Sequence, residues 1–242
     1  MAAVCAAEGG WLRWWALEPL VATVAFAVWV NLFRVLENKG DSKAAMGAVF
    51  DVRKSTRVLR AGIGYWLFIY LFKAFIPPAA PDWGCPSVFR VASEVAFGLV
   101  AYDALFFCVH VLLHRCRWLS DLSSHHVHHV NGPRTNSTTV LHHSVVDGFF
   151  QVAANILVQR QGPFGAKTFV ARLLHNVIVT YLLTESHSTA PWRLCDAFPR
   201  LLAGAKEHRK HHAHAGPPYQ QFFGYLDAAM ALIPEKAPLK KM

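Results

Sequence analysis

The chain has 242 residues, of which 54% are hydrophobic and only 16% are charged, well below the roughly 25% that is usual in soluble domains. This composition excludes an ordinary soluble enzyme and favours one all-α domain embedded in a membrane as a helical bundle. The net charge of +9 comes from basic residues that flank apolar segments, so anionic lipid headgroups or an acidic redox partner fit better than nucleic acid.

Three apolar segments come first along the chain, at about residues 17–36, 61–76 and 88–113. Each approaches the roughly 20 residues that a membrane-spanning helix needs. Tryptophans near their ends fit interfacial anchors. A signal peptide is the alternative for the first segment, but the segment lacks a convincing small-residue cleavage site, so we expect it to span the membrane.

A fourth apolar region covers residues 144–185 and is interrupted at 159–165 by the turn-forming sequence QRQGPFG. We predict a helical hairpin with arms at 144–159 and 164–185. Asp147, Gln151 and Asn155 recur every four residues and form a polar stripe, so the first arm should face other helices and not lipid.

The distribution of basic residues predicts the orientation of these four to five membrane helices. Six Lys and Arg lie in segment 37–60 and none in 77–87, which places 37–60 in the cytosol. The hairpin then returns the chain to the cytosolic side after residue 185. Lys240 near the end fits an endoplasmic reticulum protein, although the full dilysine spacing is absent, and we expect that membrane.

Five cysteines are present, and none forms a C-x-x-C pair. The odd number argues against a disulfide framework. For Cys108 and Cys116, which bracket the first histidine motif, burial as small hydrophobic side chains is favoured over ligation of a metal by thiolate.

Histidine motifs are the most informative feature. Eight of the 14 histidines form one H-x-x-x-H and two H-x-x-H-H motifs. The motifs comprise His110 and His114, then His125, His128 and His129, and finally His208, His211 and His212. Residues three and four apart share a helix face, so each motif should direct its imidazoles toward one point. Eight imidazoles exceed the needs of one metal, and we predict a pair of metals in a cytosolic histidine-rich cap.

Other functions can use the same residues. Solvated basic loops would not require this spacing. A metal transporter or sensor would place its site near the bilayer midplane on broken helices, whereas these motifs lie at helix ends on one side of the membrane. An inactive scaffold is disfavoured because every motif histidine is present.

The motifs resemble those of the fatty acid hydroxylase/sterol desaturase superfamily of membrane non-haem di-iron enzymes, over about residues 99–227. In that family an Asp precedes the first histidine by seven residues, as Asp103 does here. The family's later single histidines are matched by His143 in VLHHSVVDG and His187 in ESHSTAPW, and its closing aromatic segment by FFGYLD with Asp227. Departures include Val111, where the family usually has Arg.

The resemblance implies two iron ions, with O₂ as co-substrate, that oxidise an unactivated C–H bond by hydroxylation or desaturation. It leaves open a sterol, sphingolipid, fatty acyl or carotenoid substrate. It implies ten metal ligands: His110, His114, His125, His128, His129, His143, His187, His208, His211 and His212. Because ligating imidazoles usually hold a carboxylate or carbonyl with their other nitrogen, the candidate supporting carboxylates are Asp103, Asp121, Glu185 and Glu207.

The remaining assignments follow. Residues 1–98 form N-terminal membrane helices and a basic loop, and 99–242 the catalytic domain. His126 and His214 fall off the motif spacing and should be solvated. His175 lies about 18 Å before His187 along one helix and cannot share its metal.

No flavin or haem signature is present, so electrons must come from a donor such as cytochrome b5 or a ferredoxin-type protein. The basic residues that could dock this donor are Arg193, Arg200, Lys206, Arg209 and Lys210.

Overall fold

The computed structural model describes residues 11–38, 52–75, 80–129, 134–199 and 201–233. Regular structure in these residues is helical throughout, which confirms the all-α prediction. The long helices are α2 (Trp11–Glu37), α4 (Val52–Phe75), α5 (Val88–Arg115), α7 (Val145–Gln159) and α8 (Phe169–His187). The short ones are α6 (Arg117–Ser123), α9 (Leu194–Ala197), α10 (Gly204–His214) and α11 (Tyr225–Ala231), with single turns η1 (His125–Val127) and η2 (Ser137–Leu141).

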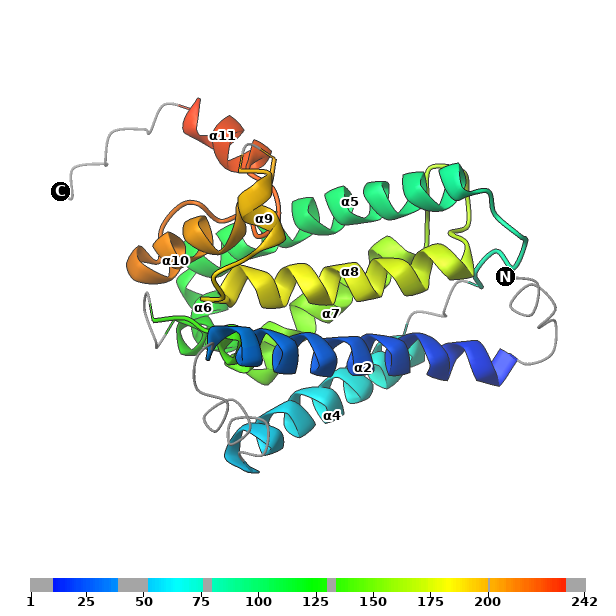
Figure 1. Ribbon diagram of the computed structural model, residues 1–242, viewed down its shortest axis with the longest axis horizontal. Helices are drawn as coiled ribbons and strands as arrows, with labels where there is room; N and C mark the ends of the chain where they lie inside the picture. Colours follow the sequence, from blue (N-terminus) through cyan, green and yellow to red (C-terminus); the bar gives the residue numbers. More distant parts are fainter. Residues whose placement is uncertain (1–10, 39–51, 76–79, 130–133, 200, 234–242) are drawn as a thin grey trace.

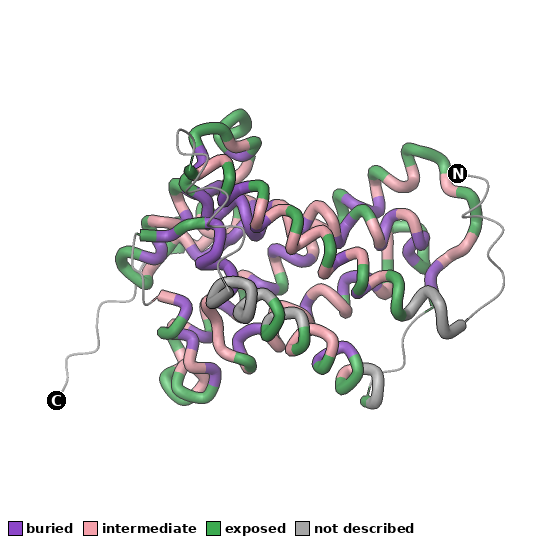
Figure 2. The backbone as a smooth tube through the Cα atoms, turned by 60° about the horizontal axis from the view of Figure 1, so that its bottom comes forward, coloured by how far each residue is buried: buried purple, intermediate pink, exposed green. Residues whose placement is uncertain are grey.

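Five long helices form a bundle, and the short helices gather at one end of it (Figure 1). Helix α8 is central, since it packs against α2, α5 and α10. Tyr102 and Phe106 of α5 meet Val179 and Leu182 of α8 in the buried core. Buried residues are also concentrated at the end that carries the short helices (Figure 2).

In the described part of the chain, two helices are long and apolar enough to cross a membrane, over Ala16–Glu37 and Val88–Arg115. Leu20, Val24 and Val28 of α2 are about half exposed and lie four residues apart, so they form one outward apolar stripe. The predicted span at 61–76 coincides with α4 up to Phe75, and its last residue lies outside the described residues. Within α4, only Ile63–Phe72 forms a shorter apolar stretch. The number and orientation of the spans stay predictions, and the proposed domain boundary at 98/99 falls inside α5.

The predicted hairpin is confirmed as a pair of helices, but its second arm begins at Phe169 and not at 164. Thr168 sets this start, because its side chain accepts a hydrogen bond from the amide of Ala171. Backbone pairing of Asp82 with Lys167 and Phe169 keeps the preceding residues extended. The helical pattern of the sequence could not predict this pairing, because Asp82 is distant in sequence from Lys167 and Phe169.

The polar stripe of α7 faces protein, as predicted. Asn155 donates to Asn176 of α8, and Gln159 donates to the same Asn176 oxygen. Lys167 is fully buried and donates to Gln159. Buried Glu94 of α5 accepts hydrogen bonds from the amide and hydroxyl of Thr168. This network joins α5, α7 and α8 at the end of the bundle remote from the short helices.

The cysteines depart from expectation. Cys85 is disulfide-bonded, which the cysteine count did not predict. Cys108 is exposed and Cys116 is half-buried, so the buried environment expected for them is wrong. Cys195 is buried, and its thiol donates to Glu185.

Candidate metal centre

The histidine motifs meet at the end of the bundle that carries the short helices. The last turns of α5 and α8, the segment around η1, and α10 each supply imidazoles. Nine of the ten predicted ligands form two groups, in each of which the candidate ligand atoms lie within 4.8 Å of one another. One group consists of His110, His114, His125, His129 and His211. The other consists of His128, His187, His208 and His212.

Within each group the Nε2 atoms converge. In the five-histidine group, Nε2–Nε2 distances are 3.3 Å for His110–His114, 3.1 Å for His114–His125 and 3.2 Å for His125–His129. In the four-histidine group they are 3.3 Å for His128–His187, 2.9 Å for His187–His208 and 3.1 Å for His208–His212. Nitrogens about 2.1 Å from one metal are separated by roughly 3.0–3.4 Å, so this spacing fits coordination.

The protonation state of the imidazoles also fits a metal site. Burial, together with neighbouring imidazoles, lowers the pKa of His211 to about 4 and of His212 to about 2. The same causes hold the pKa values of His128, His129 and His208 below the usual range. These side chains are therefore neutral near pH 7, as ligands must be. The buried Nε2 of His211 has no hydrogen-bond partner in the described residues, and a metal ion would satisfy it.

Hydrogen bonds to the other ring nitrogen fix the orientation of several imidazoles. Four Nδ1 atoms donate to backbone carbonyl oxygens: His110 to Tyr219 at 2.8 Å, His128 to His142 at 3.1 Å, His187 to Leu183 at 2.8 Å and His211 to Gly216 at 2.7 Å. A proton on Nδ1 leaves the Nε2 lone pair available for a metal. The chain therefore sets tautomer and direction before a metal binds.

One carboxylate supports a ligand directly, and it was not among the predicted four. Asp147, buried in the first turn of α7, accepts a hydrogen bond from His125 Nδ1 at 3.1 Å. The polar stripe of α7 was the signal that could have identified it, because its first member points toward the histidine-rich end. Ser144 is the N-cap of α7, and its side chain accepts a hydrogen bond from the amide of Asp147. This bond fixes the first turn of α7, which carries Asp147.

None of the four predicted carboxylates hydrogen-bonds to a histidine of either group. Glu185 accepts from Tyr181 and Cys195, since it faces α9. Glu207 pairs with Lys210 on the outer face of α10. Asp121 is exposed beside Arg117.

Buried Asp103 supports the centre indirectly. It accepts hydrogen bonds from the Gln220 side chain and from the amides of Gln221, Phe222 and Phe223. This contact holds the segment whose Tyr219 carbonyl orients His110. Asp227 accepts from the Tyr219 and Gln220 amides and steadies the same segment.

The remaining histidines take other positions. His126 and His214 are exposed, as predicted. His175 is buried and hydrogen-bonds to Asn155 inside the bundle, far from both groups along α8. His143 lies outside both groups with its Nδ1 near the Ser144 carbonyl, so its assignment as a ligand stays a prediction.

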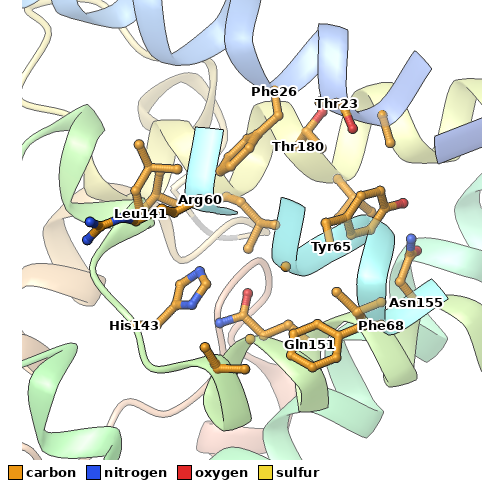
Figure 3. Close-up of a pocket in the computed structure, with 18 of the residues that line it drawn as sticks. Thr23, Phe26, Arg60, Tyr65, Phe68, Leu141, His143, Gln151, Asn155 and Thr180 are labelled. Carbon is orange, nitrogen blue, oxygen red and sulfur yellow. The ribbon is translucent and has the colours of Figure 1, made fainter. Parts of the chain in front are cut away.

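A cavity of about 650 Å³ opens between the helices of the bundle (Figure 3). Leu183 and His142, whose carbonyls orient His187 and His128, also line the cavity. The lining is mostly apolar and comes mainly from α2, α4, α7, α8 and η2, with Tyr102 of α5 and Val127 of η1. The cavity is therefore lined by two of the residues that orient ligands of the four-histidine group.

Comparison with known proteins agrees with this geometry. The fatty acid hydroxylase family model matches residues 95–231, more than half of the chain. A cholesterol 25-hydroxylase-like protein of Caenorhabditis elegans is 28% identical over 158 residues, which is 65% of this chain and 51% of the relative. The chain thus spans about half the length of that curated relative. No solved structure matches the chain. The chain belongs to the fatty acid hydroxylase/sterol desaturase superfamily.

Proposed function

We propose that the protein is a membrane-bound oxygenase that oxidises an unactivated C–H bond of an apolar lipid at two iron ions. The observation that carries this proposal is the pair of converging imidazole groups beside an apolar cavity. Bound iron would supply the activation of O₂ that such a C–H bond requires. Family membership favours this activity over metal transport or sensing.

The protein's own residues would bind, orient and exclude water. The five-histidine group would hold one iron and the four-histidine group the other. Backbone carbonyls and Asp147 fix the ligating rings, so little reorganisation accompanies metal binding. The apolar walls of the cavity would keep the substrate away from water next to the four-histidine group.

Metal content gives the first test. Protein purified without chelators should contain about two metal ions per chain, with iron in the active form and zinc as a redox-inactive substitute after overexpression. Elemental analysis with protein quantification measures the ratio. Folded protein with no metal, and none taken up on addition of Fe²⁺ or Zn²⁺, would contradict the proposed centre.

The substrate test follows from the relative's name. A sterol is the first candidate, and sphingolipids and fatty acyl lipids are alternatives. Lipid profiling of cells with and without the protein, repeated under ¹⁸O₂, identifies the product. A product with one ¹⁸O per molecule indicates hydroxylation, and a new double bond without label indicates desaturation.

We propose an orientation with both histidine groups on the cytosolic face of the endoplasmic reticulum. The disulfide at Cys85 supports it, because disulfides persist in oxidising compartments and Cys85 lies in the segment assigned to the far side. Cysteines introduced at positions 54 and 206 should react with an impermeant reagent from the cytosolic side, and one at position 80 from the other. Labelling of position 206 from the same side as position 80 would refute this topology.

Electrons would come from a separate donor with an acidic surface, such as cytochrome b5 or a ferredoxin-type protein. Lys206 and Lys210 are exposed on α10, one turn from metal-ligand candidates. Arg193 forms an ion pair with Asp196. It also donates to the Ser188 carbonyl, which accepts a second hydrogen bond from Arg209 of α10, so Arg193 lies near that helix. Arg200 lies outside the described residues. This basic face next to the four-histidine group supports donor docking there.

A further inference from the structure

The two ends of the cavity differ in chemistry. His143, Leu141 and Arg60 lie at one end, and Tyr65 and Asn155 lie at the other (Figure 3). Arg60 is the one Lys or Arg in the described lining, which holds no Asp or Glu, and its side chain is exposed. The remote end therefore offers neutral polar groups on apolar walls.

Hydrogen-bonding capacity is left over at this remote end. Tyr65 lines the cavity, and its hydroxyl makes no hydrogen bond to the described part of the chain. Asn155 and Asn176 share one amide–amide bond, and each keeps an amide hydrogen that no described acceptor takes. A polar group that a bound ligand covers without pairing is costly, so a ligand that offers a hydrogen-bonding group at this position is favoured.

The polar end is also held rigid. Asn155 accepts from His175 at 3.1 Å, and Asn176 accepts from Gln159 at 2.9 Å. Gln159 in turn accepts from buried Lys167 at 3.1 Å. The amides of α7 and α8 are therefore oriented by neighbours before any ligand enters, which lowers the entropic cost of binding.

We propose that this end binds a neutral hydroxyl group of the substrate, so that the lipid is an elongated apolar alcohol and not a carboxylate or phosphate. The inference rests on the proposed function and adds the substrate's chemical class. A buried carboxylate or phosphate would need a cationic partner, and no described lining residue at this end supplies one. A hydroxyl can donate to an amide oxygen and accept from Tyr65 or an amide hydrogen.

Distances along the helices add a positional consequence. Ser144 and Asn155, both in the lining, are separated by about 16 Å along α7, and Leu183 and Asn176 by about 10 Å along α8. An anchored hydroxyl therefore lies at least about 10 Å from the end beside the four-histidine group. Oxidation should occur on a carbon far from that hydroxyl.

Binding to zinc-loaded protein tests the inference without turnover. The probes are cholesterol, its methyl ether and its sulfate, with hexadecan-1-ol and hexadecanoate as a second scaffold. On each scaffold the free alcohol should bind more tightly than its capped or charged counterpart. Tyr65→Phe should weaken binding of the alcohols about 3- to 10-fold, the effect of one neutral hydrogen bond. The methyl ether should show a smaller change.

Tyr70→Phe is the matched control, because Tyr70 lies on the same helix outside the cavity lining. Its alcohol affinity should equal that of the parent. Equal affinity for charged and neutral probes, an equal effect of Tyr65→Phe on all probes, or no binding on either scaffold would overturn the inference. Charged probes whose affinity falls in Arg60→Gln would place the headgroup at the opposite end. Metal content and ¹⁸O₂ incorporation are separate measurements, so failure here leaves the proposed function testable.

Discussion

Replacing His128 or His211 with alanine should remove one metal ion and abolish turnover. His128→Ala leaves three imidazoles in the four-histidine group, and His211→Ala leaves four in the other. Because each variant affects one group, metal content should fall from about two ions to about one per chain. Turnover should fall by more than the roughly 10- to 100-fold that loss of a supporting hydrogen bond costs at metal sites. Elemental analysis and product formation provide the two measurements.

His126→Ala and His214→Ala are the controls, since both side chains are exposed in the same segments as the ligands. Both variants should keep two metals and most activity. Loss of metal from His126→Ala equal to that from His125→Ala would show that the assigned register is wrong. His143→Ala in the same series decides whether His143 is a ligand or only lines the cavity.

The sequence predicted which histidines come together better than it predicted how they are distributed between the two groups. The motif spacing suggested that each H-x-x-H-H directs three imidazoles toward one point. In the structure, His208 and His212 share a group, and His211 joins the other. Successive helical residues are rotated by about 100°, so positions i+3 and i+4 point to either side of position i. Two such motifs therefore bridge two sites.

Contacts between distant segments explain the other differences. Hydropathy located α2 and α5 because each helix has a continuous apolar pattern. It could not place the start of α8, which depends on backbone pairing with Asp82. The sequence analysis named Glu185 and Glu207 as candidate partners of the ligating histidines, yet the supporting carboxylate is Asp147, 22 residues from His125. Composition alone did not reveal the disulfide at Cys85.

Asp103→Asn should destabilise the protein and weaken metal binding to the five-histidine group. Asp103 is fully buried, and its two oxygens accept four hydrogen bonds from residues 220–223. An asparagine amide keeps the volume but presents N–H groups to backbone N–H donors, and leaves buried donors unpaired. The cost should be on the order of 3 kcal/mol in the free energy of unfolding. It should appear as a lower unfolding midpoint in detergent.

The effect on the metal follows through Tyr219. When the 220–223 segment loosens, its preceding carbonyl no longer fixes the Nδ1 atom of His110. Affinity for one of the two metals should then fall about 10- to 100-fold, as measured by competition with a chelator. Asp121→Asn is the matched control, because that carboxylate is exposed and should affect neither measurement. If Asp103→Asn bound both metals as tightly as the parent, the segment that Asp103 holds would not orient His110. Asp103 would then have a purely structural role.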